Sequence, residues 1–270
     1  DLAIVVDATG SMVNEINGVG AWLKELCDEI SKKAGTGEPL TLNAQRREIV
    51  LPGGADICVS LVCYQDIGAT GQSPYNTKVI LTGANLSTDR ARIDQAFAAL
   101  TPETLGGGRE AIHDGLSRAL KEPEIWRKDS STRILLVVAD EPGDSGDEEQ
   151  KQVLAAMPLP EGVDPGPKTD LSQYRREFTH VFAIYTEAEG FDKFKHNLRM
   201  LIPGDQLDAR VANILGFEKS NSRRQLFTDQ LFEKIEFAQR EVDRRVKTLL
   251  EKLMNGVIDP EPTSIPNVPT

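Results

Sequence analysis

The chain has 270 residues, of which 39% are hydrophobic and 27% are charged, a composition that can bury a substantial core. Its 42 acidic residues outnumber its 31 basic residues, and the net charge of −11 argues against binding to nucleic acid or to an anionic membrane, since both need a basic surface. No apolar run approaches the ~20 residues of a bilayer-spanning helix and no signal peptide is visible, so we expect no membrane insertion.

The chain begins with an apolar run that leads into a polar turn. Residues 2–6 are aliphatic without polar alternation, which is typical of a strand buried on both faces of a parallel sheet. Asp7, Thr9 and Ser11 follow, and apolar residues then recur every three or four positions over 16–30, which predicts an amphipathic helix. Because ligands bind beyond the carboxyl ends of strands in open α/β sheets, this turn lies where a site is expected.

The polar side chains of this turn have the chemistry of a site for a hard metal ion. Asp7 offers a carboxylate, and Thr9 and Ser11 offer hydroxyls at alternating positions, so that oxygen atoms can converge on one point. Mg²⁺ and Mn²⁺ prefer oxygen ligands and commonly keep open positions for water or a ligand. The alternative is a helix N-cap, in which the same residue types bind free backbone N–H groups.

Strand and helix patterns continue through the first half of the chain. Residues 57–64 predict a core strand that ends just before Asp66, and 78–81 predict a short edge strand. A Ser-Thr-Asp start and apolar residues at helical spacing predict a helix over 87–100. The Gly-rich loop at 106–108 lacks the Gly-Lys-Ser/Thr ending of a P-loop, so we do not expect nucleotide binding.

The second half contains another apolar strand that ends in an acidic residue. Residues 133–139 form this strand and lead into Asp140. We expect the acidic loop at 141–149, at the same end of the sheet, to be mostly solvated. Residues 180–185 predict a further core strand and 191–201 a short helix.

The segment Asp7-Ala8-Thr9-Gly10-Ser11-Met12, after a buried first strand, resembles the metal-ion-dependent adhesion site (MIDAS) of von Willebrand factor type A (vWA) domains. The family pattern is Asp-x-Ser/Thr-x-Ser, then a distant Thr, then a distant Asp. Asp7, Thr9 and Ser11 match the first part, and Asp140 matches the distant Asp. The resemblance implies that these four residues bind a divalent ion, Mg²⁺ or alternatively Mn²⁺ or Ca²⁺.

The third element of the family pattern has several candidates in this chain. Residues 105–116 resemble the Gly-rich loop and following helix of the family, and this alignment places Glu110 where a Thr is common. If the loop is longer, Thr104 or Thr101 supplies the hydroxyl instead. Since some family members have an acidic residue in this loop, Glu110 is compatible with a metal site.

Two further acidic residues are candidates for contact with a metal-bound water. Asp66 follows the strand of 57–64 in a Tyr-x-Asp sequence that resembles the end of this strand in many family members. Asp144 lies in the acidic loop after Asp140 and would orient a water on the metal. A solvated turn residue is the alternative for both.

The resemblance covers most of the chain and implies its architecture. We expect an α/β fold with a doubly wound, Rossmann-like, mostly parallel sheet, helices on both faces and one antiparallel edge strand. Residues 1–256 would form this domain, with insertions near 35–55 and 150–175. Apolar residues at helical spacing over 229–254 predict a terminal amphipathic helix, and the Pro-rich residues 257–270 a tail or linker.

The expected function is metal-dependent recognition of a partner protein that presents an Asp or Glu to the ion. The alternative is a scaffold or regulatory module with a vestigial metal site, which binds partners through its helices. We expect no enzyme, because aspartyl phosphatases need a second Asp where this chain has Thr9, and Ser11 is not in a Gly-x-Ser-x-Gly sequence. We also expect this chain to be part of a larger multidomain chain or complex.

The cysteines give an expectation about the compartment. Cys27, Cys58 and Cys63 cannot all be paired with one another, and each lies in an apolar helix or strand pattern, as buried small hydrophobic residues do. An odd number without a disulfide framework favours the cytoplasm, although an extracellular location is compatible with so few cysteines.

Overall fold

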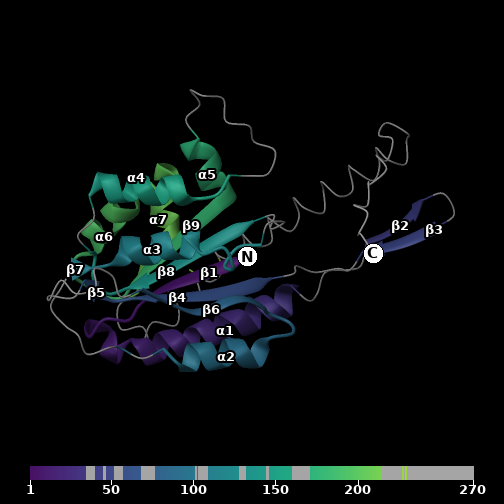
Figure 1. Cartoon of the computed structure of the whole chain (residues 1–270), viewed down its shortest axis with the longest axis horizontal. Coiled ribbons are helices and arrows are strands. Elements are labelled where there is room, and N and C mark those ends of the chain that lie inside the picture. Colours follow the sequence, from purple (N-terminus) through teal and green to yellow (C-terminus); the bar gives the residue numbers. More distant parts are fainter. Residues whose placement is uncertain are drawn as a thin grey trace, which may run out of the picture.

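The structure is a computed structural model that describes residues 1–34, 40–44, 47–51, 57–67, 77–100, 102, 109–127, 132–143, 146–159, 171–214, 227 and 229. A central sheet separates two layers of helices (Figure 1). Helices α1 (Ile16–Ala34) and α2 (Arg90–Ala98) cover one face. The other face is covered by α3 (Ile112–Lys121), α4 (Asp147–Ala156) and α6 (Phe191–Leu198).

The central sheet has six strands in the order β10-β9-β8-β1-β4-β6. All neighbouring pairs are parallel except β4 with β6, so the expected mostly parallel sheet with one antiparallel edge strand is confirmed. The strands are β1 (Leu2–Asp7), β4 (Cys58–Tyr64), β6 (Thr77–Asn85), β8 (Arg133–Ala139), β9 (Thr179–Tyr185) and β10 (Val211–Asn213).

Burial on both faces of the sheet explains the continuous apolar runs. In β1, Leu2, Ile4 and Val6 pack in the core cluster that contains α1 and α2, whereas Ala3 and Val5 pack in the cluster that contains α3, α4 and α6. Every residue of β1, β4 and β8 is buried. Because alternate side chains enter opposite apolar clusters, these strands do not show the alternation of polar and apolar residues that is typical of a strand with one exposed face.

Short elements connect and extend this framework. A hairpin of β2 (Leu40–Ala44) and β3 (Arg47–Leu51) forms a separate antiparallel sheet within the segment expected to be an insertion, and it lies apart from the central sheet in Figure 1. The remaining elements are η1 (Ser11–Asn14), β5 (Asp66–Ile67), β7 (Arg109–Glu110), α5 (Ser172–Phe178), η2 (Gly204–Gln206) and α7 (Leu207–Arg210).

The predicted terminal helix lies almost entirely outside the described residues. Within it Asp229 is described, and its backbone, like that of Phe227, is helical. The Phe227 ring is buried against Phe182, with the two ring centroids 6.0 Å apart in an edge-to-face arrangement. The Pro-rich segment 257–270 lies outside the described residues.

Two other expectations concern membranes and thiols. Among the described helices, none is long and apolar enough to cross a membrane. Cys27, Cys58 and Cys63 are all buried, as expected for small core residues. Burial raises the pKa of the Cys27 thiol to about 12, which keeps it protonated and unreactive near neutral pH.

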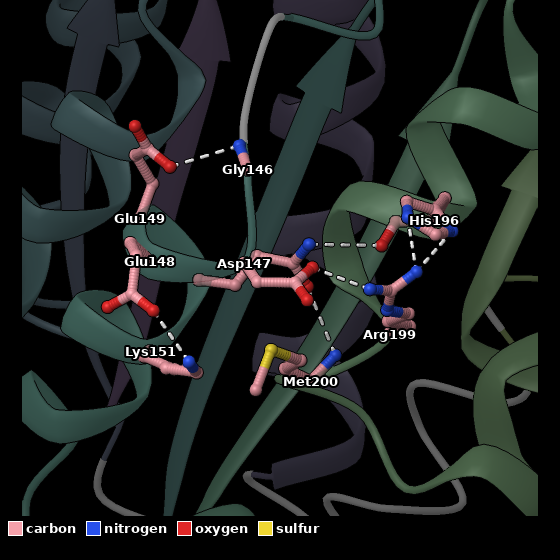
Figure 2. Close-up of polar contacts among 9 residues, drawn as sticks. Gly146, Asp147, Glu148, Glu149, Lys151, His196, Arg199 and Met200 are labelled. Atoms are coloured by element: carbon pink, nitrogen blue, oxygen red, sulfur yellow. Dashed lines mark hydrogen bonds and ion pairs between the residues drawn. The ribbon is translucent and has the colours of Figure 1, made fainter.

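Helix α4 begins inside the segment expected to be an acidic loop. Asp147, Glu148 and Glu149 occupy its first turn, where carboxylates interact favourably with the helix dipole. Glu149 Oε2 accepts a hydrogen bond from the Gly146 backbone N–H at 3.0 Å, and Asp147 forms an ion pair with Arg199, which follows α6, at 2.5 Å (Figure 2). These carboxylates therefore stabilise a helix start and its contact with α6.

A buried glutamine of α4 holds the end of α6. Gln150 is fully buried; its Nε2 donates to the His196 carbonyl at 3.2 Å and its Oε1 accepts from the Met200 N–H at 3.3 Å. We expect Gln150→Leu to lower the free energy of unfolding by roughly 1–2 kcal/mol, since one backbone group of α6 and one just after it lose their partner. Urea denaturation measures this, with the exposed Gln152→Leu as the matched control. Equal stability of the two variants would contradict this role.

Candidate metal centre

Asp7 is the most deeply buried member of the candidate site. It is the last residue of β1 and is 0% exposed. Its Oδ1 accepts a hydrogen bond from the Thr9 backbone N–H at 2.9 Å, and its Oδ2 accepts one from the Tyr64 hydroxyl at 3.1 Å. The first bond fixes the turn after β1, and the second ties the carboxylate to the neighbouring strand β4. Both hold the carboxylate in one orientation.

The other three motif residues form a hydrogen-bonded chain. Thr9 Oγ1 lies 2.9 Å from Ser11 Oγ, and Ser11 Oγ donates to Asp140 Oδ1 at 3.1 Å. Thr9 and Asp140 are each 2% exposed, whereas Ser11 is exposed. The four residues that the sequence singled out thus lie together, with Ser11 facing solvent.

Sheet topology explains this meeting of residues from distant parts of the sequence. Strands β1 and β8 are parallel neighbours in register, with Val6 opposite Val138. Their carboxyl ends therefore lie at one edge of the sheet, where Asp7 ends β1 and Asp140 follows β8. This is the edge at which open α/β sheets bind ligands.

Burial and nearby negative charge disfavour the ionised forms of the two carboxylates. Burial, together with the negative charge of Asp140, raises the pKa of Asp7 to about 7, although the hydrogen bonds from Thr9 and Tyr64 oppose the rise. Burial also raises the pKa of Asp140 to about 6, against the Ser11 hydrogen bond and with a contribution from Glu141. A cation at this place would relieve an unfavourable concentration of negative charge.

The remaining predicted ligands are described only in part. Asp66 in β5 and Glu110 in β7 are directly opposite each other in an antiparallel pair, so the structure brings their backbones together. Nothing is described of their side chains. Thr101, Thr104 and Asp144 lie outside the described residues. Among the described residues there is no group of three or more His, Cys, Asp or Glu side chains that could hold a metal ion. The described donor set is therefore two carboxylates and two hydroxyls.

Two residues that support the site were not identified from the sequence. Tyr64 donates to Asp7 from 57 positions away, and the Tyr-x-Asp pattern was the only local signal for it. Asn197 of α6, 1% exposed, donates through Nδ2 to the carbonyls of Pro142 and Gly143, in the latter case at 3.1 Å. It thereby fixes the loop that follows Asp140.

Comparison with known proteins gives the fold. No family model matches the chain, and no curated protein matches it significantly. Two solved structures of proximal thread matrix protein 1 from the mussel byssus match with TM-scores of 0.54 and 0.53, at 17% and 16% identity. Each match covers 86% of this chain and 47% of the mussel protein. The fold is vWA-like.

Two further matches agree with this fold. A third mussel structure, with TM-score 0.52 and 16% identity over 86% of this chain and 45% of that one, is described as having a zinc-occupied MIDAS motif. The conserved hypothetical protein BatB from Bacteroides thetaiotaomicron matches with TM-score 0.50 and 10% identity, over 87% of this chain and 98% of BatB. The chain spans about half the length of the mussel protein. At these identities the likeness establishes the fold alone.

Proposed function

We propose that this chain is a protein-interaction module that binds a divalent ion through Asp7, Thr9, Ser11 and Asp140 and recognises an acidic residue of its partner through that ion. One observation carries the proposal. Oxygen side chains from the ends of two neighbouring strands converge, and the two carboxylates among them are buried. Buried carboxylates are normally paired with a cation or coordinate a metal.

The described donor set fits a hard divalent ion. Carboxylate and hydroxyl oxygens suit Mg²⁺, Mn²⁺ or Ca²⁺ better than zinc, which more often takes nitrogen and sulfur ligands. Zinc in the MIDAS motif of the mussel protein supports a divalent ion at this place in the fold. The ion supplies a positive charge with an open position that an incoming carboxylate can fill.

The chain's own residues have separate roles in this proposal. Asp7 and Asp140 supply negative charge, directly or through water, while Tyr64 keeps the Asp7 carboxylate in place. Thr9 and Ser11 are neutral ligands, so they bind the ion without reducing its charge. Few anionic ligands leave the ion attractive to a partner's carboxylate. If Glu110 also bound the ion, the affinity for an acidic partner would be lower.

A second candidate function is a scaffold or regulatory module with a vestigial metal site. It is favoured because the described residues include no group of three or more His, Cys, Asp or Glu side chains that could hold a metal ion. Partners would then bind the helices. In both proposals the chain acts by binding rather than by catalysis.

Titration with Mg²⁺ and Mn²⁺ separates the two candidates. We expect saturable binding by isothermal calorimetry in the wild type and at least a ~10-fold loss of affinity in Ser11→Ala, with the fold retained because Ser11 is exposed. Ser87→Ala, at another exposed serine, is the matched control. Absence of binding in the wild type would retire the metal proposal and direct the search to the helical faces.

The metal affinity should also depend on pH, because the ion competes with protons for the two carboxylates. The pKa values of Asp7 and Asp140 are raised to about 7 and about 6, so both carboxylates bind protons as the pH falls through this range. We expect the Mg²⁺ affinity to fall by at least ~10-fold between pH 8 and pH 5.5, with proton release on binding at pH 6. Calorimetry in two buffers of different ionisation enthalpy measures the released protons.

Recognition of an acidic residue has its own test. Peptides that contain a single Asp or Glu in varied sequence contexts are compared with matched Asn or Gln peptides, in Mg²⁺ and in EDTA. The proposal expects binding that needs both the carboxylate and the ion. Binding that persists in EDTA would instead support the scaffold module.

A further inference from the structure

Val13 is an exposed apolar side chain beside the candidate metal centre. It is 53% exposed, and among the described residues it is the one large hydrophobic side chain that is exposed. It belongs to η1, the short helix that begins at Ser11, and Met12 between these two residues is fully buried. Since single exposed apolar residues are common on protein surfaces, the position of Val13 is more informative than its exposure.

The backbone of η1 holds Val13 close to Ser11. The Met12 N–H donates to the Thr9 carbonyl at 3.2 Å, and the Val13 N–H donates to the Gly10 carbonyl at 3.4 Å. Because a 3₁₀ helix rises ~2.0 Å per residue, Val13 lies ~4 Å beyond Ser11 along the helix axis. Neighbouring residues of a bound peptide are separated by about the same distance, ~3.8 Å between Cα atoms. A residue next to a partner's metal-bound carboxylate can therefore reach Val13.

Acidic side chains border the site on the side of β8 and β9. Glu141 directly follows Asp140 and is exposed. Glu187 is also exposed, and it follows Thr186, whose backbone N–H donates to the Ala139 carbonyl at 3.0 Å at the end of β8. Besides burial, the charges of Glu141 and Glu187 raise the pKa of Asp140, as expected for carboxylates close to it.

The strand order β9-β8-β1 gives the arrangement of these groups along the edge of the sheet. Glu187 follows β9, and Val13 lies beyond the end of β1. The hydrogen bond from Ser11 to Asp140 joins the ends of β1 and β8. Because neighbouring strands are ~4.8 Å apart, the distance from β9 to β1 is ~10 Å, the length of about three extended residues. One short peptide segment can therefore contact both sides of the site.

We propose that the partner segment bound at this site carries, on either side of its acidic residue, an apolar side chain that packs on Val13 and a basic side chain that pairs with Glu187 and Glu141. This inference rests on the metal-dependent function proposed above. Further acidic residues in the segment would be repelled by the two glutamates, whereas a basic residue is attracted to them. Contact with Val13 adds affinity by removing apolar surface from water. The surface thus selects an acidic residue in an apolar and basic context.

A set of short blocked peptides with a central Asp tests this selection. One peptide has two leucines on one side of the Asp and two arginines on the other, and the others replace the leucines, the arginines or both with serine. Each is made in both orders. In saturating Mg²⁺ at low salt, we expect the peptide with leucine and arginine, in one of its orders, to bind at least ~10-fold more tightly than the peptide with serine on both sides. Matched peptides with a central Asn measure the binding that does not use the carboxylate.

Two variants assign each flank of the peptide to its surface residue. Val13→Ser should weaken the binding of leucine-containing peptides at least ~3-fold and leave that of the serine-substituted ones unchanged. Glu187→Gln should weaken the binding of arginine-containing peptides about 2–5-fold, and less at high salt. Glu25→Gln, at an exposed position of α1, is the matched control for Glu187, and Glu141 is left intact because it adjoins Asp140. Val13→Ser should bind Mg²⁺ alone as the wild type does.

The outcomes separate this inference from the function on which it rests. If the Asp peptides bind in Mg²⁺ more tightly than the Asn peptides, but leucine and arginine add nothing, this inference is wrong and the metal-dependent function stands. The same conclusion follows if Val13→Ser and Glu187→Gln bind every peptide as the wild type does. If Mg²⁺ does not bind, or if the Asp and Asn peptides bind equally, the proposed function fails and this inference fails with it. The wild-type peptide series is decisive without either variant.

Discussion

Replacing Asp7 with Asn is expected to abolish Mg²⁺ binding and at the same time to stabilise the metal-free protein. The carboxylate is fully buried, and its pKa is raised from 3.8 to about 7 by burial and by the charge of Asp140. An Asn has nearly the same shape, can accept from the Thr9 N–H and can donate to the Tyr64 hydroxyl. It therefore keeps the local structure but removes a charge that is unfavourable inside the protein.

The pH dependence of this stabilisation has a definite sign. A carboxyl group with a raised pKa in the folded state contributes stability below its unfolded pKa, near 3.8, and loses it as the pH rises through about 7. In EDTA, the stability advantage of Asp7→Asn should thus grow between pH 4 and pH 7 and then level off, at roughly 2–4 kcal/mol. Saturating Mg²⁺ should stabilise the wild type and leave the variant unchanged.

Urea denaturation in EDTA and in Mg²⁺, at pH values from 4 to 8, measures both effects. Asp94→Asn is the control, since Asp94 forms a surface ion pair with Arg90 whose loss should cost less than about 1 kcal/mol. If Asp7→Asn instead destabilises the metal-free protein at pH 8, the carboxylate is a structural acceptor for the turn. That result would favour the helix-capping alternative over a metal ligand.

The four central residues of the site were predictable because their signal is local. A buried strand followed by Asp7, Thr9 and Ser11, and a second such strand followed by Asp140, predict side chains at the same edge of a parallel sheet. The structure brings these four together through hydrogen bonds that join Asp7 to Thr9, Thr9 to Ser11 and Ser11 to Asp140. The sequence also predicted an edge strand at 78–81, which lies within β6, and the resemblance to vWA domains implied that this strand is antiparallel.

Other features depend on contacts that a sequence pattern does not encode. The partnership of Tyr64 with Asp7 and that of Asn197 with the Pro142–Gly143 loop depend on the packing of separate elements. The start of α4 was missed because an acidic run resembles a solvated loop, although the same charges favour a helix amino terminus.

A valine at Gly115 is expected to cause the largest loss of stability proposed for this chain. Gly115 lies in α3 and allows the helix to approach the sheet closely. A Cβ atom at this position would lie 2.9 Å from Tyr64 Cδ1 and 3.0 Å from Val5 Cγ1, too near for either to remain in place. Because both neighbours are buried in strands, we expect Gly115→Val to cost roughly 3 kcal/mol or more and Gly115→Ala less, since alanine adds only one methyl group and favours the helix.

The same substitution links core packing to the metal centre. Tyr64, which a side chain at Gly115 would displace, donates to Asp7 through its hydroxyl at 3.1 Å. We therefore expect Gly115→Ala, at a temperature where it is fully folded, to weaken Mg²⁺ binding severalfold although it touches no candidate ligand. Gly204→Ala and Gly204→Val are the controls, because a Cβ at Gly204 meets nothing within 4 Å. Loss of stability without a change in Mg²⁺ affinity would show that Tyr64 does not position Asp7, whereas parallel losses would make the packing of α3 on β4 a determinant of the site.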